Sequence, residues 1–293
     1  MIKRTMGERV FSVINTIVLV AIVFISLYPI WHVIVASFSN NTELLRHRGI
    51  LLWPVGEPSL DAYNIVFQNP MVTKGYLNTI FVVVVGSFVN IVMTCIAAYV
   101  LSRKEFMWRR LLTMMIVITM YFSGGLIPFY FTVRDLNLDG SLWSLIIPSA
   151  INAFNLIILR TSFDGVPESL IESARMDGAR HFTVLFKIVV PLCLPSIAVI
   201  ILYYGVAHWN DWFNAMIFLG TEREKYPLQL ILREILLQNT MQDSAAVNTD
   251  NRPDIGETVR YALIVVATIP VLFVYPFLQK YFVKGVMVGA VKE

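Results

Sequence analysis

Long stretches without a charged side chain are the feature that most constrains the fold. Six windows of 19 to 33 residues contain no Asp, Glu, Lys or Arg, namely 10–42, 75–102, 111–133, 140–159, 188–210 and 261–279. About 20 apolar residues cross a bilayer as a helix, and a helix satisfies its own backbone hydrogen bonds in lipid. The sequence therefore predicts an all-α integral membrane protein with six transmembrane helices. The predicted spans are approximately 10–38, 75–102, 111–133, 140–160, 191–220 and 260–281.

The composition agrees with one transmembrane domain over residues 1–293. Hydrophobic residues make up 57% of the chain and charged residues 15%, against roughly a quarter charged in soluble domains. The net charge of +3 is too small to indicate a nucleic-acid partner. Cys95 and Cys193 lie in apolar windows without metal-ligand spacing, so no metal site is expected. The first window is too long for the apolar core of a signal peptide, so we expect it to be a retained span.

Basic residues next to the windows predict the orientation. With the N-terminus inside, the inner segments hold 14 Lys and Arg residues and the outer segments hold nine. The loop "SRKEFMWRR", at 102–110, contributes the clearest cluster. The positive-inside rule therefore favours an N-in and C-in arrangement. Two long segments, 43–74 and 221–258, then lie outside, and loops of this length are usually functional or disordered.

Residues 164–190 face the cytoplasm in this arrangement, and their first part predicts a short helix. Glu168 and Glu172 are acidic residues suited to the positive N-terminal end of a helix. Glu172 and Arg175 are three residues apart, so they are predicted to pair on one face. Gly178 is predicted to end the helix, as glycine does at a C-terminal cap.

A second short helix is predicted after the glycine. Phe182, Leu185, Phe186 and Val189 follow i, i+3, i+4, i+7 spacing, which gives one apolar stripe. Pro191 marks the entry to the next span. On spacing alone, this helix pair could equally be an interfacial element that lies on the bilayer surface.

The residues of this loop resemble the EAA motif of ABC importer permeases. That motif runs E-A-A, three residues, G, nine residues, then I-x-L-P. The chain has E-S-A at 172–174, Gly178, and I-V-V-P at 188–191. Ser173 replaces the first alanine and Val190 the leucine, while the spacing is intact.

The resemblance covers nearly the whole chain. "YLNTIFVVVV…AAYVLSR" at 76–103 and "GGLIPFYFTVRDLNLDGSLWSLIIPS" from 124 onward are similar to carbohydrate-uptake permeases of the oligosaccharide subgroup. The resemblance implies a permease subunit of an ATP-driven, binding-protein-dependent sugar or oligosaccharide importer in a bacterial cytoplasmic (inner) membrane. It implies four kinds of partner: a second permease subunit that forms a heterodimer with this chain, two ATPase subunits, an extracytoplasmic solute-binding protein and membrane lipid.

The resemblance also implies a division of labour. The sequence has no G-x-x-x-x-G-K-[ST] phosphate loop, so the chain is expected to be a transport subunit and not an enzyme. ATP and Mg are expected on the partner ATPase, with no cofactor bound by this chain. Residues 168–191 are expected to couple to that ATPase. The coupling residues implied by the motif and its neighbours are Glu172, Ser173, Ala174, Arg175, Asp177, Gly178, Arg180, Ile188 and Pro191.

Polar residues inside the predicted spans are candidates for a substrate path. Asp211 interrupts an apolar run, and a charge in a bilayer usually faces a cavity or a partner. His208 lies three residues earlier and would share its face, and aromatic rings beside hydrogen-bonding groups suit a sugar. The candidates are Asn152, Asn155, His208, Trp209, Asn210, Asp211 and Trp212. The competing interpretation for Asp211 is an interfacial belt or helix packing. Asn152, Asn155 and Asn90 are weaker path candidates, and each is predicted instead to form interhelical hydrogen bonds.

Other functions leave different signatures. A stand-alone secondary transporter would show internal repeats and ionisable residues in broken mid-membrane helices, and only Asp211 hints at this. An intramembrane enzyme would need a paired nucleophile and base or metal ligands within the spans, and the sequence contains no such set. An ABC importer of a non-sugar solute stays open, as does the choice between neutral and acidic oligosaccharides of the alginate or pectin type.

Overall fold

The structure is a computed structural model that describes residues 6–245 and 256–290. No strand occurs among these residues, which agrees with the all-α prediction. Contacts divide the chain into two compact units, one of residues 1–69 with 235–269 and one of residues 70–234 with 270–293. Helices α13 (Leu228–Ala245) and α14 (Glu257–Ala290) each contribute to both units. The two units are described separately.

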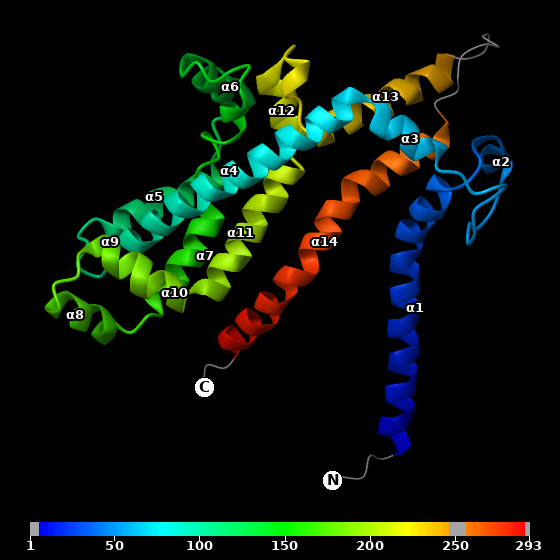
Figure 1. The fold of residues 1–293 in the computed structure, drawn as a ribbon. Helices are drawn as coiled ribbons and strands as arrows, with labels where there is room; N and C mark the ends of the chain where they lie inside the picture. The colour runs from blue at the N-terminus through cyan, green and yellow to red at the C-terminus, as the bar shows by residue number, and fades with distance from the viewer. Residues whose placement is uncertain (1–5, 246–255, 291–293) are drawn as a thin grey trace. The chain divides into compact units, whose positions relative to one another are not determined.

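The first unit begins with the long apolar helix α1 (Met6–Ser37), drawn in dark blue in Figure 1. Its large apolar side chains are mostly exposed from the N-terminal end to Trp31. Only its last turns pack, where Val35 and Ala36 form a small core with Leu51. A helix that exposes apolar side chains over most of its length is suited to a lipid environment.

Short elements follow α1 in the same unit. Helix α2 (Asn41–Arg46) begins after Asn40, whose side chain accepts a hydrogen bond from the amide of Thr42 at 3.0 Å. Helix α3 (Asp61–Gln68) follows the connecting segment. That segment is held to α1 because the indole of Trp31 donates to the carbonyl of Leu52 at 3.0 Å.

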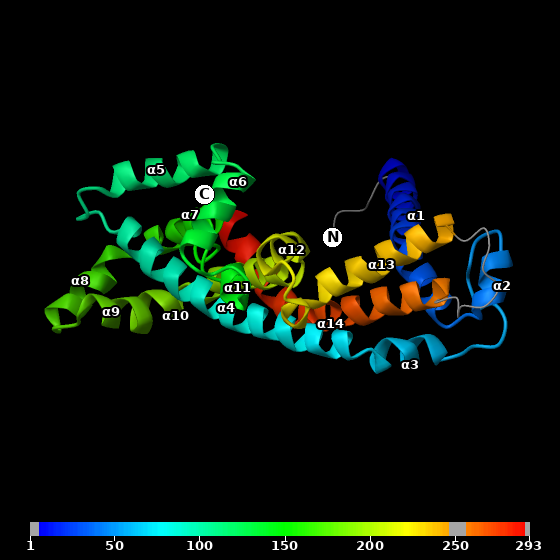
Figure 2. The same ribbon diagram turned by 90° about the horizontal axis from the view of Figure 1, so that it is seen from above.

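The second unit is built around α4 (Pro70–Ser102), which packs against α7 (Ala153–Asp164) and α11 (Leu194–Trp209) (Figures 1 and 2). The core contains buried side chains from all three helices and from the loop between α7 and α11. Its residues include Ala98, Leu156, Leu159, Phe163, Ile171, Val184, Leu185, Val189, Ile197 and Ile200. The predicted cytoplasmic loop is therefore packed on the same core as the apolar helices.

The two short loop helices form as predicted. Helix α8 (Glu168–Met176) ends before Gly178, whose φ of +79° is a left-handed conformation that favours glycine. The amide of Ala179 donates to the carbonyl of Ala174 at 2.9 Å, which closes the helix end. Helix α9 (His181–Val184) continues through a π-helical turn, η2 (Leu185–Val189), into α10 (Val190–Leu192).

The predicted single apolar stripe on this second helix is wrong. Val184, Leu185 and Val189 are buried, whereas Phe182 is 66% exposed and Phe186 is also exposed. The π-helical turn carries an extra residue, so side chains five apart, at 184 and 189, both face the core. The rings of Phe182 and Phe186 stack on each other with centroids 6.5 Å apart on the outside.

The segment predicted as one helix over 111–133 is broken. It forms α5 (Arg109–Tyr121) and α6 (Leu126–Asp135), whose axes differ by 119°. The break contains two consecutive glycines, and Gly125 has a φ of +88°. This conformation costs an L residue with a side chain more than it costs glycine, so the chain turns here at little cost.

The segment predicted as one helix over 140–160 is also not continuous. It holds the short 3-10 helix η1 (Leu142–Leu145), a non-helical stretch that contains Pro148, and then α7. Helix α7 begins after Asn152, whose side-chain oxygen accepts from the amide of Asn155 at 3.1 Å. A proline and an Asn N-cap explain why the helix starts only at Ala153.

The segment predicted as one helix over 191–220 divides in two places. A bend of 89° separates α10 from α11 around Cys193, just before Pro195. Helix α11 then ends at Trp209, and α12 (Trp212–Leu219) follows. The predicted outer segment 221–258 contains the 3-10 helix η3 (Arg223–Lys225) and all of α13, while 246–255 lie outside the described residues.

By length and composition, two described helices can cross a membrane, α1 and α4. The number rises to four if each of the two bent pairs, α5 with α6 and α9–α10 with α11, forms one span. The count of six spans and the N-in orientation stay predictions.

Candidate functional site: the α8–α9 loop and the polar contacts of α4

Helix α8 is fixed to the second unit by one face. Ile171 on that face is fully buried in the core. Glu168 and Arg175 lie three residues before it and four after it, and both form ion pairs with the segment that follows α4. The ammonium of Lys104 lies 3.6 Å from Glu168, and the guanidinium of Arg175 lies 2.5 Å from the carboxylate of Glu105.

The predicted pair between Glu172 and Arg175 is wrong. Arg175 turns inward to Glu105, and its guanidinium lowers the pKa of the Glu105 carboxyl below the usual range, mainly through their hydrogen bond. Glu172 is exposed, and it has no ion pair within the described part of the chain. Spacing along one helix suggested Glu172 as the partner of Arg175, but the segment after α4 supplies a carboxylate from 70 residues away.

The outward face of α8 carries the first part of the motif. Glu172 and Ser173 are exposed, as is Asp177 just beyond the helix, and Met176 is 88% exposed. Ala174 is partly buried and packs against the core. The Glu-Ser-Ala part of the motif is therefore divided: Glu172 and Ser173 are exposed, and Ala174 packs inward.

The second part of the motif has mixed exposure. Arg180 is exposed at the start of α9, Ile188 is half-buried in the π-helical turn, and Pro191 is exposed within α10. Gly178 forms the turn between the two helices. Of the residues predicted for coupling, Glu172, Ser173, Asp177 and Arg180 are thus available at the surface, and Arg175 is engaged inside the loop.

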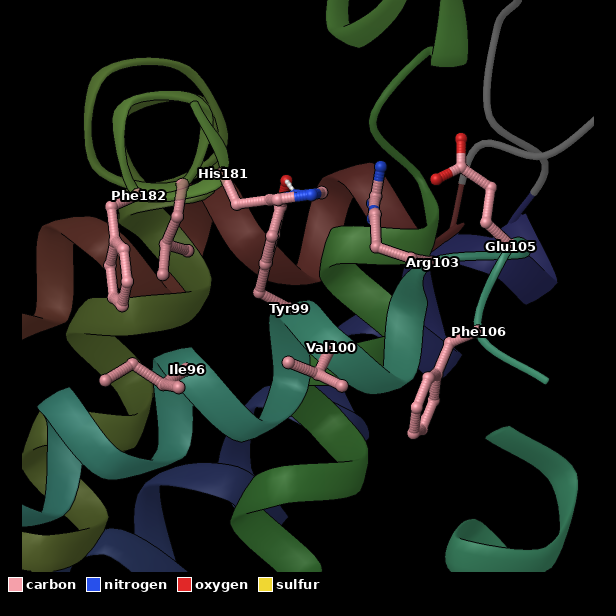
Figure 3. Close-up of a pocket in the computed structure, with 9 residues that line it drawn as sticks. Ile96, Tyr99, Val100, Arg103, Glu105, Phe106, His181 and Phe182 are labelled. Carbon is pink, nitrogen blue, oxygen red and sulfur yellow. Dashed lines mark hydrogen bonds between the residues drawn. The ribbon is translucent and has the colours of Figure 1, made fainter. Parts of the chain in front are cut away.

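A hollow of about 390 Å³ lies between α9 and the C-terminal end of α4 (Figure 3). Its polar rim includes Tyr99 and His181, which lie side by side, and Arg103, whose guanidinium sits 5.1 Å from the Tyr99 ring centroid. The walls are mainly apolar. The lining residues are Ile96, Tyr99, Val100, Arg103, Glu105, Phe106, His181, Phe182 and Leu185. The surface beside the loop helices is therefore concave.

Asp211 has a local role that its spacing did not reveal. Because α11 ends at Trp209, Asp211 does not continue the helical face of His208. Its carboxylate accepts from the backbone amide of Asn214 at 3.2 Å and from the side-chain amide of Asn214 at 3.0 Å, so it caps the N-terminus of α12. The prediction that His208 and Asp211 share a face is wrong.

His208 instead belongs to a buried polar contact with α4. Its Nε2 atom lies 2.7 Å from the side-chain oxygen of Asn90, and both residues are buried. The side-chain amide of Asn90 donates to the carbonyl of Ser149 at 2.5 Å. The prediction that Asn90 forms interhelical hydrogen bonds is confirmed.

A second polar contact lies one helical turn further along α4. The hydroxyls of Thr94 and Tyr204 are 2.8 Å apart, and Tyr204 also accepts from the backbone amide of Asn152 at 3.0 Å. Asn90 and Tyr204 together satisfy backbone groups of the non-helical stretch before α7. Such partners allow irregular backbone to occur among apolar helices. Thr94 and Tyr204 were missed because neither interrupts an apolar pattern strongly.

The remaining path candidates serve in packing and capping. Trp209 is buried and meets the ring of Tyr76 at 6.4 Å between centroids. Trp212 lies under the guanidinium of Arg233 at 3.5 Å, and the side chain of Asn210 donates to the carbonyl of Val206. Asn155 is buried in α7. The predicted path residues are thus spread over several contacts.

This arrangement defines a class of protein. A helical chain with span-length apolar helices, a two-helix loop fixed by one face and an exposed Glu-Ser-Ala…Gly motif on the other has the features of a membrane transport component. The family described as "Binding-protein-dependent transport system inner membrane component" matches residues 90–288. The chain belongs to this family, whose members include permeases of ABC importers for sugars.

Relatives match over almost the entire length. The "Polygalacturonan/rhamnogalacturonan transport system permease protein YtcP" of Bacillus subtilis is 42% identical over 98% of this chain and 100% of its own. "Protein LplC" of the same organism is 39% identical over 98% of this chain and 97% of its own. A chain of the crystal structure of a bacterial ABC transporter involved in the import of the acidic polysaccharide alginate is 34% identical, with a TM-score of 0.86 over 96% of this chain and 100% of that chain.

Proposed function

We propose that this chain forms half of the translocation path of an ATP-driven, binding-protein-dependent oligosaccharide importer and that residues 168–191 couple it to a separate ATPase. One observation carries the coupling proposal. Helix α8 is anchored inward by Ile171 and Arg175, while Glu172 and Met176 stand exposed on its other side. A helix held this way presents a fixed surface to a partner.

The exposed side of the loop combines apolar and charged groups. Leu170, Met176 and Phe182 are exposed beside Glu172 and Asp177. Exposed apolar side chains occur at surfaces that bind a protein or a membrane, and we assign these three to a protein partner. A groove with an apolar floor and a basic residue opposite Glu172 would complement this surface.

The coupling itself would be a population shift. An ATPase that closes on ATP would bind one position of α8 better than another, and the helices that contact the loop would follow. ATP and Mg belong to the ATPase in this proposal, and this chain binds no cofactor. A second permease and a solute-binding protein on the outer side complete the assembly, with 221–258 as the proposed receptor contact. The six-span, N-in arrangement is part of the same proposal.

Acidic oligosaccharides are the first cargo class to test. The relatives named above include a polygalacturonan/rhamnogalacturonan permease and a chain of an alginate importer. A carboxylate at Asp211 would oppose an anionic sugar if it faced the path. Because Asp211 is engaged with Asn214 as a helix cap, this objection carries less weight.

The alternative of a stand-alone secondary transporter rested on Asp211 as an ionisable group in a broken helix. The cap contact gives that residue a structural explanation. An importer of a non-sugar solute stays as the second candidate, and the cargo assay separates the two.

The test uses cells that express this chain with its genomic neighbours, with an affinity tag on this chain. We expect an ATPase subunit to co-purify with the wild-type chain and Glu172→Lys to abolish both co-purification and uptake. Glu57→Lys is the matched control, because Glu57 is exposed in a different unit and has no ion pair within the described residues. If Glu172→Lys leaves ATPase binding and uptake intact, residues 168–191 are not the coupling element.

The cargo is measured on the partner solute-binding protein. Titration with oligogalacturonate, oligoalginate and neutral oligosaccharides of matched length should give tighter binding for the acidic members. Binding restricted to neutral sugars would exclude the acidic cargo, and binding to none of them would favour the non-sugar importer.

A further inference from the structure

Two consecutive residues after α4 bind the two ends of α8. Lys104 pairs with Glu168 in the first turn at 3.6 Å, and Glu105 pairs with Arg175 in the last turn at 2.5 Å. Glu168 and Arg175 are seven residues apart, which is about two turns and about 10 Å of helix. The short segment 104–105 therefore contacts the helix at both termini.

The order of the charges fixes the direction of the helix. A carboxylate favours the N-terminal end of a helix and a cation favours the C-terminal end. Glu168 and Arg175 follow this order, and Lys104 and Glu105 carry the opposite signs. A reversed helix, or one shifted by a residue or two, would lose both pairs.

The pair at the C-terminal end of α8 is the closer one. The side chains of Lys104 and Glu168 are 79% and 39% exposed, and those of Arg175 and Glu105 are 27% and 64% exposed, so solvent reaches both pairs. The pKa of Arg175 is raised, mainly by its hydrogen bond to Glu105.

The segment that carries Lys104 and Glu105 is fixed to the end of α4. The amide of Arg103 donates to the carbonyl of Val100, and the amide of Phe106 donates to the carbonyl of Arg103, both at 3.3 Å. The guanidinium of Arg103 is buried and donates to Ser102 and to the carbonyl of Phe163 in α7. The two ion pairs therefore connect α8 to a segment that is itself fixed to the end of α4.

Helix α4 carries the polar contacts to the interior. Asn90 bonds His208 of α11 and Ser149, and Thr94 bonds Tyr204 of α11. These hydrogen bonds connect α4 to α11 and to the non-helical stretch before α7.

We propose that Lys104 and Glu105 form the mechanical link through which α8 moves α4, with Glu105 as the main positioning residue. This inference rests on the proposed function, since it assumes that α8 is the helix an ATPase moves. It adds the contacts through which a movement of α8 would reach α4. It assigns Arg175 to these contacts and not to contact with the ATPase.

The experiment compares Glu105→Arg, Arg175→Glu and the double charge swap in the full complex in lipid nanodiscs or proteoliposomes. The readouts are ATPase co-purification, ATP hydrolysis and solute imported per ATP hydrolysed. We expect Glu105→Arg to retain ATPase co-purification but to lower the solute imported per ATP severalfold. The double swap should restore most of that ratio, because it restores the pair with its charges exchanged.

Glu57→Arg is the control with the same change of charge, and it should leave the ratio unchanged. Glu105→Gln, which removes the charge without adding a cation, should give a smaller loss in the same direction. The link is excluded if Glu105→Arg leaves the ratio unchanged, if it abolishes ATPase co-purification, or if the double swap fails to restore the ratio. Failure of the proposed function looks different, because the wild-type chain would then not co-purify with any ATPase.

Discussion

The Nε2 atom of His208 lies 2.7 Å from the side-chain oxygen of Asn90, a contact between α11 and α4 across 118 residues of sequence. The two helices come this close because Gly86 faces the imidazole. A Cβ atom at Gly86 would lie 2.7 Å from that same Nε2 atom, which is closer than a Cβ carbon approaches a neighbouring heavy atom. The absent side chain is what permits the buried hydrogen bond.

Replacement of Gly86 by Ala is therefore expected to destabilise the protein. The methyl group would displace His208 from Asn90, and overpacking of this kind costs roughly 1–3 kcal/mol. Gly205→Ala is the matched control in the partner helix, because its Cβ would meet Ser87 at an ordinary 3.8 Å. Thermal unfolding in detergent should show a lower midpoint for Gly86→Ala than for Gly205→Ala. Equal midpoints would mean that the close approach does not matter.

Asp211 is expected to tolerate residues that can cap a helix. Loss of an N-cap side chain costs about 0.5–2 kcal/mol, so Asp211→Ala should lower the thermal midpoint, while Asp211→Ser and Asp211→Asn should largely preserve it. Uptake should follow the same order as stability. If Asp211→Ser and Asp211→Asn keep full stability but abolish uptake, Asp211 acts in the substrate path and not only as a helix cap.

The contact between Glu105 and Arg175 is expected to survive mild acid. The guanidinium lowers the pKa of Glu105 in the folded chain, so the stabilisation from this pair is complete above the ordinary glutamate pKa and is lost as the pH falls through the lowered value. An ordinary glutamate has a pKa of about 4.3. Hydrogen exchange of the α8 amides, corrected for the intrinsic rate, should therefore stay constant from neutral pH to about pH 5 and should rise only when the pH falls below the ordinary glutamate pKa.

Glu105→Gln provides the comparison for that measurement. Its α8 amides should exchange faster at neutral pH, and the acid-induced rise assigned to this carboxyl should be absent. A rise in wild-type exchange at or above the ordinary glutamate range would contradict the lowered pKa.

Local sequence patterns predicted the features that depend on neighbours in the chain. Charge-free windows gave the apolar helices α1 and α4, because a long apolar stretch has no other way to satisfy its backbone in lipid. Gly178 gave the end of α8, because a left-handed residue at a helix end is most easily a glycine.

The same patterns failed where an apolar segment contains a break in the regular α-helix. The windows over 111–133 and 191–220 read as continuous helices, but glycines at 124–125 and the cap at Asp211 divide them. The apolar stripe from Phe182 to Val189 was read with the period of an α-helix, and the π-helical turn changed which side chains face the core.

The sequence by itself determined that this chain is helical and apolar, that it places two short helices joined by a glycine turn between apolar segments, and that it carries a spaced Glu-Ser-Ala…Gly motif there. Only the tertiary structure decided that Arg175 pairs with Glu105 and not with Glu172. It also decided that His208 bonds Asn90 of α4 and does not share a helical face with Asp211. The physical reason is that spacing along a helix indicates only which neighbouring residues of the same helix a side chain can reach. A hydrogen bond or ion pair forms with whichever group packing brings closest, and that group can come from anywhere in the chain.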